Sequence, residues 1–526
     1  MKTKRLTPLG KTVIFGLVAV IVLTGVYFVG GFDFIKNLNS GNNSGSTIDI
    51  SVSNTPTTSS SKPNSSNKKD DTLNISLDEW IGWKSVIDAN GGLTTQKGSI
   101  FDELGINVEL HIINDATQSS NALIKGELDG AGYTVNRYAF LHSKFEENKF
   151  ETVMPFITNY STGGDGIISK DSINGIEDLV GKKIGVPRFS EAQTMVYWLL
   201  NKSDLTDEQI AQIEKDMVLF ETPDDAAKAF FAGQIDAAAT WQPYLSQAQE
   251  TSGAKLLFST KSSNNIILDG IIFGKEYYEN NIDTISKFIE GVLKAQELYT
   301  IEFASIKNTM PLFSTETNES IVSMTEDASL ASYQDNVKLL DDQAKTMFKD
   351  MSEIWIQLGE KANPEAAEKA FDSKALKMLD GKFTTTVSST PKFTEEQREK
   401  AKTQENTAAL LKKSVSINFQ ANSAVFVDAE EANEALKEFV EIAKILDGSI
   451  IQIEGNVAAV GSNDEAGEKL SLARAKAIAE ALKYEGIDPS RFVVIGNGSK
   501  NQIAPNDTEE NMAKNRRTDI FFKIVE

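Results

Sequence analysis

The sequence predicts an α/β protein with mainly parallel sheets, preceded by one N-terminal transmembrane helix and followed by a smaller α+β domain. Three observations lead to this prediction. Between residues 73 and 380, short apolar runs alternate with amphipathic helical patterns, which is typical of α/β folds. Residues 414–526 have a compact strand and helix pattern of their own. Residues 12–32 carry no charged side chain.

The N-terminal segment has the pattern of a membrane anchor. A basic tail, residues 1–11, precedes the uncharged residues 12–32. A helix rises about 1.5 Å per residue, so this run spans a hydrocarbon core of about 30 Å. The basic tail marks the cytoplasmic side, and we expect a single-pass cell-membrane protein with most of the chain extracytoplasmic. A cleaved secretory signal is the alternative, although residues 29–31 (VGG) match a cleavage site poorly.

Composition argues against several classes of protein. The formal net charge of −22 argues against nucleic-acid binding, which needs clustered Lys and Arg. The absence of cysteine excludes disulfides, thiolate metal sites and a lipid-modified cysteine anchor. His111 and His142 have no metal-ligand neighbour at useful spacing, and no HExxH, P-loop or GxSxG motif occurs. We therefore expect no enzyme, no metal and no cofactor.

Residues 33–72 are rich in Asn, Ser, Thr, Gly and Pro and lack an apolar period, which predicts a flexible stalk. The next region, 73–380, contains the elements of the predicted α/β domain. They are a strand at 106–113, a helix from 120, a strand at 151–159, a helix and a strand at 176–187, a helix at 190–202, a helix and a strand at 223–241, and a helix at 285–299.

Three segments of this region carry a family resemblance, namely residues 82–134, 164–200 and 226–243. They resemble type 2 periplasmic solute-binding proteins, in the branch that serves nitrate, sulfonate and thiamine-precursor importers. The resemblance implies two α/β lobes joined by crossing strands, with a small-molecule ligand between the lobes. We expect the crossings near 163–168 and 264–272. An ABC permease or a sensor protein is the implied partner.

The loops that this family turns toward the ligand contain the candidate site residues. They are Trp80, Trp83, Thr134, Asn136, Asp165, Ser190, Trp241 and Asp269. Each Trp has an alternative role in the core, and an Asp beside Gly commonly forms a turn. Ser190 has an alternative role as a helix N-cap, with Gln193 completing a capping box.

The candidate residues favour two different ligand classes. Asp165 and Asp269 favour a ligand with an amine or ring N–H donors. Ser190, before a predicted helix, favours a carboxylate, sulfonate or phosphate. Both classes stay open at this point.

Residues 381–413 are predicted to be a linker followed by a charged helix. The last domain, 414–526, has the predicted order β-α-β-α-β-β. Its motifs are INFQANSAVF from 417, IEGNVAAVGS from 453, LSLARAKAIAEAL from 470, GIDPSRFVVIGNG from 486 and NDTEENMAKNRRTDIFF from 506. They resemble the OmpA-like peptidoglycan-binding family, and this resemblance implies peptidoglycan as a partner.

In the OmpA-like family, an Asp and an Arg hold the diaminopimelate of the wall peptide. Arg474 matches this Arg, and Asn422 and Arg517 match further family positions, but Ala458 stands where the family has Asp. Asp464 and Glu465 are nearby acids that would compensate for the missing Asp. Residual or altered wall binding is one interpretation, and a domain kept for its fold or for a protein partner is the other. Arg517 has the alternative role of bracing the last strand.

The sequence as a whole predicts a membrane-tethered extracytoplasmic solute-binding receptor. It binds a small molecule between two lobes, and its C-terminal domain is a candidate attachment to peptidoglycan. The alternative is a structural linker between membrane and cell wall whose binding-protein domain no longer binds a ligand.

Overall fold

The computed structural model describes residues 72–263, 266–298, 301–383, 392–404, 409–458 and 464–524. The predicted basic tail and transmembrane helix, and the stalk up to residue 71, lie outside these ranges. Among the helices of the described ranges, none is long and apolar enough to cross a bilayer.

The first lobe, lobe 1, is built on a seven-stranded mixed sheet. Its strand order is β12-β5-β11-β3-β1-β2, and β4 pairs with β11. The strands are β1 (Thr72–Leu77), β2 (Asn107–Ile112), β3 (Gly130–Thr134), β4 (Thr152–Val153), β5 (Ile157–Ser161), β11 (Leu268–Gly274) and β12 (Ala328–Leu330).

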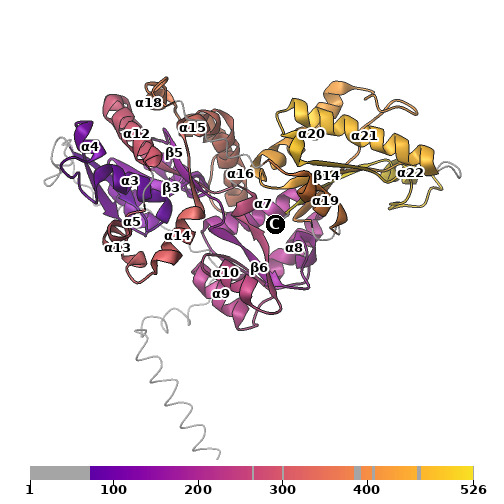
Figure 1. Ribbon diagram of the computed structural model, residues 1–526, viewed down its shortest axis with the longest axis horizontal. Coiled ribbons are helices and arrows are strands. Elements are labelled where there is room, and N and C mark those ends of the chain that lie inside the picture. The colour runs from indigo at the N-terminus through magenta and orange to yellow at the C-terminus, as the bar shows by residue number, and fades with distance from the viewer. Residues whose placement is uncertain are drawn as a thin grey trace, which may run out of the picture. The chain divides into compact units, whose positions relative to one another are not determined.

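The helices of lobe 1 cover this sheet (Figure 1). Phe288 of α12 makes ring contacts with Phe101, Phe156 and Phe273, so that one aromatic cluster joins helix to sheet. The helices before lobe 2 are α3 (Lys84–Asn90), α4 (Ile100–Glu103), α5 (Ala116–Ile124) and α6 (Val135–Glu147). Those after it are α11 (Lys275–Asn280), α12 (Ile282–Glu297), α13 (Phe303–Thr309), α14 (Asn318–Glu326), α15 (Tyr333–Lys338), α16 (Ala344–Gln357), α17 (Ala367–Ala370) and α18 (Lys374–Lys377).

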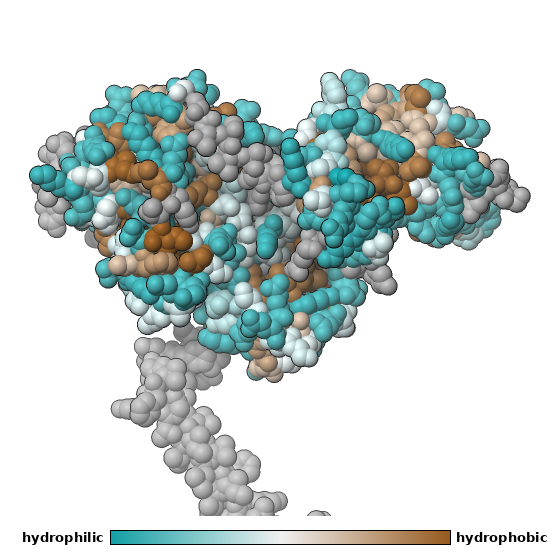
Figure 2. All heavy atoms as spheres, in the orientation of Figure 1, coloured by the Kyte–Doolittle hydropathy of each residue, from teal (hydrophilic) through white to brown (hydrophobic). Residues whose placement is uncertain are grey.

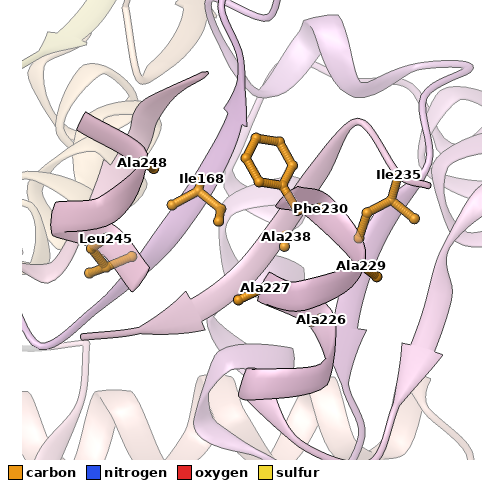
Figure 3. Packing of buried hydrophobic residues seen from close by; sticks show 9 residues of the cluster. All are labelled: Ile168, Ala226, Ala227, Ala229, Phe230, Ile235, Ala238, Leu245 and Ala248. Atoms are coloured by element: carbon orange, nitrogen blue, oxygen red, sulfur yellow. The ribbon is translucent and has the colours of Figure 1, made fainter. Parts of the chain in front are cut away.

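The second lobe, lobe 2, is built on a five-stranded sheet of order β10-β6-β9-β7-β8. Alanines of α9 let this helix approach the sheet closely, and Phe230 fills the space beside Ile168 and Ile235 (Figure 3). The strands are β6 (Asp165–Lys170), β7 (Ile184–Pro187), β8 (Val218–Phe220), β9 (Ala237–Trp241) and β10 (Ala254–Ser259). The helices are α7 (Glu191–Lys202), α8 (Asp207–Asp216), α9 (Pro223–Phe231) and α10 (Tyr244–Glu250).

The chain passes between the lobes twice, from β5 to β6 and from β10 to β11, as predicted for a two-lobed binding fold. The two crossings are joined by the hydroxyl of Thr260. It accepts the N–H of Gly163 at 2.9 Å and lies 2.9 Å from the hydroxyl of Ser161. Paired crossing segments of this kind form a hinge between two rigid lobes.

The prediction of mainly parallel sheets is wrong. Parallel pairs join β1 to β2 and β3, and β7 to β8 and β9. The strands next to the crossings run the other way, so β11 and β6 are antiparallel to their neighbours. A strand that returns to a sheet through a crossing is not constrained by a helical connection, and local periodicity does not encode its direction.

The C-terminal domain has a four-stranded sheet of order β13-β16-β14-β15. The predicted element order lacks one helix, α22, which lies before the last strand. This helix is short and polar, and its local signals are the Thr508 N-cap, two acids in its first turn and Lys514 in its last turn. The elements are β13 (Leu411–Val415), α20 (Ala429–Ile445), β14 (Ile450–Gly455), α21 (Asp464–Tyr484), β15 (Phe492–Gly496), α22 (Glu509–Asn515) and β16 (Thr518–Lys523).

The charged helix predicted in the linker is α19 (Glu395–Thr403), and it packs on this sheet. Phe393 and Ala401 contact Ile450 of β14 and Val493 of β15. Lys523, fully buried in β16, donates to the backbone oxygens of Ala401 and Gln404 at 2.9 and 2.8 Å. A buried cation therefore caps the C-terminus of α19, where carbonyl groups lack helical partners.

We expect Lys523→Met to release α19 from the domain. The substitution removes the Lys523 donor from the carbonyls of Ala401 and Gln404, which costs about 1–3 kcal/mol. Hydrogen–deuterium exchange on the full chain measures this as lost protection in α19. Lys476→Met, which changes an exposed lysine of α21, is the control and should leave protection unchanged. Equal protection of α19 in both variants would contradict the capping role.

The surface of the molecule is mostly polar on the face drawn in Figure 2, with apolar residues in separate patches. Large exposed apolar side chains are spread over many elements, for example Leu219, Leu298, Val427 and Ile503. Scattered exposed apolar side chains are ordinary for a folded protein.

Candidate functional site

The predicted ligand site lies where strand ends of the two lobes meet. Asp78 follows β1, Thr134 ends β3, and Asp269 of β11 is the register partner of Thr134. In lobe 2, Glu191 opens the helix after β7, and Asp165 is the register partner of Trp241 at the end of β9. Ligands of α/β folds bind outside the carboxyl ends of the strands.

Side chains from the two lobes touch directly at this place. Thr134 donates its hydroxyl hydrogen to Oε1 of Glu191 at 3.0 Å. Arg137, one turn along α6, places Nη2 3.1 Å from Oε2 and Nε 3.0 Å from Oε1 of the same carboxylate. The lobes are therefore joined by a bidentate ion pair and a hydroxyl.

Asp269 is the most unusual residue of the site. Its side chain is 4% exposed, and its Oδ2 has no hydrogen-bond partner among the described residues. Burial raises the pKa of Asp269 well above its ordinary value, and the charges of Asp78, Glu191 and Asp165 raise it further, against a hydrogen bond from Trp80. A buried carboxylate oxygen without a donor is costly for a protein by itself, so an outside donor would suit this place.

Asp165 and Asp78 complete the group of acids. Burial raises the pKa of Asp165 to about 7, with smaller contributions from Glu191 and Asp327, against a hydrogen bond from Ser161. Burial also raises the pKa of Asp78. The negative charge of Glu191 raises the pKa of Arg137, and this effect outweighs burial, which lowers it. Strongly shifted carboxyl groups gathered in one place are typical of functional sites.

Trp80 and Trp83 have different positions. Trp83 is fully buried, so it takes the core role that was its alternative, and its Nε1 donates to Oδ1 of Asp78 at 2.6 Å. Trp80 is half-buried and donates to Oδ1 of Asn159 at 2.8 Å. A Cβ placed on Gly164 would lie 2.8 Å from the Trp80 ring, so the crossing segment approaches this ring closely because it has glycine there.

Asn136 is fully buried at the start of α6, where it faces helices from both sides. Its Nδ2 donates to the hydroxyl of Thr194 in α7 at 3.0 Å. Its Oδ1 has no partner among the described residues. Its backbone oxygen accepts the indole N–H of Trp355 at 3.0 Å. Asn136 therefore connects the two lobes and also leaves one acceptor open.

Ser190 is the N-cap of α7, as its alternative role required. Its Oγ accepts the N–H of Gln193 at 3.2 Å and donates to the backbone oxygen of Pro187 at 2.7 Å. The predicted capping box is wrong in one detail, because the Gln193 side chain accepts from Phe189 at 2.7 Å. Phe189 has a positive φ of 55°, which moves the reach of Gln193 back by one residue.

Trp241 is the most exposed of the candidate residues that are tryptophan, with 43% of its surface accessible. Its Nε1 donates to Oδ1 of Asp224, in the first turn of α9, at 2.9 Å. As the cross-strand neighbour of Asp165, Trp241 presents an aromatic surface beside the acids.

Sequence reasoning missed three residues of the site: Asp78, Arg137 and Glu191. Each lies beside a residue that was identified, and each had a signal. Asp78 is the first residue after β1, Arg137 is one turn beyond Thr134, and Glu191 directly follows Ser190. Polar residues at or just beyond strand ends therefore indicate a ligand site as much as the tryptophans do.

In the C-terminal domain, neighbouring residues hold the side chain of Arg474 in place. Its guanidinium lies 5.0 Å from the centre of the Phe419 ring, and Nε donates to the backbone oxygen of Ser423 at 3.0 Å. Burial lowers the pKa of Arg474, and the charge of Arg516 lowers it further. Asn422 is exposed in the adjoining loop with a φ of 50°. These contacts orient the Arg474 guanidinium, which is close enough to Arg516 to feel its positive charge.

Arg517 has the structural role that was its alternative. It is buried, its Nε donates to Oδ1 of Asp519 at 2.9 Å, and its Nη1 donates to the backbone oxygen of Asn501 at 3.0 Å. Ala458 is also buried. Glu465 is exposed and forms a surface ion pair with Lys469 at 2.6 Å. The side chain of Asp464 lies outside the described atoms.

A groove of about 680 Å³ lies elsewhere in lobe 1, beside β2 and α5. None of the predicted ligand-binding residues lines it. Its lining includes His111, Asp115, Gln118 and Lys125. Asp115 is already the N-cap of α5, and no Phe, Tyr or Trp lines the groove. The interlobe acids therefore stay the better candidate site.

Two family models match the chain. Residues 91–301 match the family described as NMT1/THI5 like, and residues 418–516 match the OmpA family. These matches agree with the two resemblances found in the sequence.

Individual proteins are similar to one part of the chain or the other. Outer membrane protein A of Bordetella avium is 36% identical over 90 residues, which cover 17% of this chain and 46% of that protein. The chain thus spans about half of that relative. A putative binding protein of Brucella abortus is 21% identical over 256 residues, 45% of this chain and 76% of that protein. The crystal structure of the periplasmic aliphatic sulphonate binding protein SsuA from Escherichia coli aligns with a TM-score of 0.44 and 16% identity, over 57% of this chain and 97% of that one.

Proposed function

We propose that this chain, which combines an NMT1/THI5-like domain with an OmpA-family domain, is an extracytoplasmic solute-binding receptor and not an enzyme. The observation that carries the proposal is Asp269, a buried carboxylate with one oxygen lacking a donor among the described residues. It lies between two lobes that a hinge connects. A ligand that enters the open form and donates to Asp269 would stabilise the closed form.

We infer that the ligand carries a protonated amine or ring N–H donors. Four carboxylates act on one another here, those of Asp78, Asp165, Glu191 and Asp269, and Arg137 is the cation that the site supplies. A cationic ligand offsets the remaining negative charge, whereas an anion adds to it. Ser190, the residue that favoured an anion, already uses its hydroxyl on Pro187.

A thermal-shift screen on the full chain tests this proposal. Primary amines, amidines and aminopyrimidines form one arm, and methanesulfonate, nitrate and phosphate form the other. We expect a saturable rise in melting temperature from a member of the first arm, because a ligand that binds the folded state alone stabilises it. If no compound of the first arm stabilises the chain, the result favours the alternative, which is a structural linker whose binding-protein domain no longer binds a ligand.

The binding of such a ligand should strengthen as the pH rises through about 7. The pKa of Asp165 is raised to about 7 from 3.8, so below pH 7 binding must first remove a proton. If the ligand stays protonated, affinity should fall about tenfold per pH unit below 7.

The stability of the ligand-free protein should change in the opposite direction. A raised folded-state pKa contributes stability that is full below about pH 4 and is lost as the pH rises through 7. Titration calorimetry and melting curves between pH 5 and 8 measure both trends. Asp165→Asn isolates the contribution of Asp165, since other carboxyls titrate as well. Identical pH profiles for the two proteins would contradict the assignment.

The N-terminal segment is proposed to tether this receptor to the cell membrane, so that an ABC permease or a sensor protein meets it there. The basic tail and the uncharged run of residues 12–32 support this proposal. Membrane fractionation with an alkaline wash tests it, with a chain that begins at residue 33 as the control. Release of the full chain by the wash would count against a spanning helix.

A weakened or altered attachment to peptidoglycan is proposed for the C-terminal domain. Arg474 is oriented as a guanidinium for a carboxylate, whereas Ala458 supplies no partner for an ammonium group. Co-sedimentation of the full chain with purified peptidoglycan tests this, and Arg474→Ala should reduce retention. Unchanged retention of this variant would show that the domain does not use Arg474 for wall binding.

A further inference from the structure

We propose that Glu191 is an internal anion that determines which solutes the receptor accepts. Its carboxylate reaches from lobe 2 into lobe 1 and occupies a place that an oxyanion ligand would take. This inference rests on the proposed solute-binding function and adds a specificity-determining residue to it. By this account the receptor excludes anionic solutes because the carboxylate of Glu191 already occupies their place.

The groups that hold Glu191 form a site for an oxyanion. The Arg137 guanidinium meets both carboxylate oxygens, with Nε–Oε1 and Nη2–Oε2 distances of 3.0 and 3.1 Å. The Thr134 hydroxyl adds a third donor at 3.0 Å. A planar guanidinium fork with a hydroxyl beside it matches carboxylate, sulfonate and phosphate groups equally well.

The donors and the acceptor come from different lobes. Thr134 and Arg137 belong to β3 and α6 of lobe 1, whereas Glu191 is the first residue of α7 in lobe 2. A bound ligand in a two-lobed receptor bridges the lobes in this manner. Glu191 makes such a bridge from the protein's own chain, and the N-terminus of a twelve-residue helix favours its negative charge.

An incoming oxyanion would have to displace Glu191 from Arg137. The released carboxylate would then lie among Asp78, Asp165 and Asp269 without its cation. The carboxylates that act on Arg137 are those of Glu191 and Asp78, so a displaced Glu191 would leave the cation that now neutralises it. Removing one partner of a partly buried ion pair is costly, and this cost excludes oxyanions.

The experiment compares anion binding by wild type and Glu191→Ala in the full chain. The probes are methanesulfonate, nitrate and inorganic phosphate, and binding is measured by titration calorimetry. We expect the affinity for at least one probe to rise about tenfold or more in the variant. The gain should disappear in the double variant Glu191→Ala/Arg137→Ala. Glu208→Ala removes an exposed acid from α8 of the same lobe and should produce no gain.

Glu191→Gln keeps the shape of the side chain and removes its charge, so it serves if the alanine variant fails to fold. Anion binding gained by either variant and lost with Arg137 supports the inference. No gain in folded variants would overturn it, and so would anion binding by wild type that depends on Arg137. If the wild type binds none of the amines and the Glu191→Ala variant gains anion binding, the proposed ligand class is wrong and this inference still holds.

Discussion

Asp269→Asn should abolish ligand binding and at the same time stabilise the ligand-free protein. The Oδ2 of Asp269 lacks a donor among the described residues, and burial, with a further contribution from three other carboxylates, raises its pKa. Loss of a buried charge from a charge-assisted pair costs about 2–5 kcal/mol, so the affinity for an amine should fall at least about 30-fold. Removal of the like-charge repulsion should raise the stability without ligand by about 1–2 kcal/mol.

Opposite changes in binding and stability distinguish a ligand site from a structural one. A purely structural Asp269 would lose stability on substitution, because its neighbours are arranged around it. The control is Asp283→Asn, which changes an exposed acid in α12 of the same lobe. Titration calorimetry gives the affinity, and melting curves at pH 7.5 give the stability. A destabilised Asp269→Asn protein that still binds its amine would contradict this account.

Much of the fold was predictable because it depends on local signals. The helix at 190–202 and the helix and strand at 223–241 carry caps and apolar periods within a few residues, and α7, α9 and β9 lie there. The crossings were placed well by family resemblance. Strand direction was not predictable, since the antiparallel position of β11 depends on segments far away in the chain.

Part of the candidate site was predictable from the sequence, and its chemistry was predictable less well. Asp165 and Asp269 were identified, and the structure brings them close enough for the charge of Asp165 to raise the pKa of Asp269. The sequence left amine and anion ligands open because it did not show which groups Ser190 and Glu191 bind. A pair such as Arg137–Glu191, 54 residues apart, depends on the closure of the lobes and leaves no local pattern.

The C-terminal domain shows the same limit for a single substitution. The sequence identified Ala458 as a missing carboxylate and proposed Asp464 or Glu465 as replacements. In the structure Glu465 is exposed and pairs with Lys469 at 2.6 Å, and an exposed ion pair of this kind is weak. Phe419 and Ser423 hold the Arg474 guanidinium in place. Under the proposed wall-binding function, Arg474 would meet the carboxylate of the ligand, and the ammonium group of the ligand would lack a partner.

Supplying this missing partner should restore strong wall binding. We expect Ala458→Asp to increase retention of the full chain on diaminopimelate-containing peptidoglycan by about tenfold or more, because a new carboxylate supplies the partner for the ammonium group. The double variant Ala458→Asp/Arg474→Ala should lose this gain, since both charges of the ligand must be met together.

Two comparisons show whether the gain comes from recognition or from added charge. Ala473→Asp places a carboxylate on an exposed position of α21 and should leave retention unchanged. Peptidoglycan whose side-chain amines have been acetylated should bind Ala458→Asp no better than wild type, because the ammonium group is then absent. If the gain in retention persists after acetylation, or if Ala473→Asp produces the same gain, the domain does not recognise a zwitterionic ligand. No gain in a folded Ala458→Asp protein would show that Ala458 is not what limits wall binding.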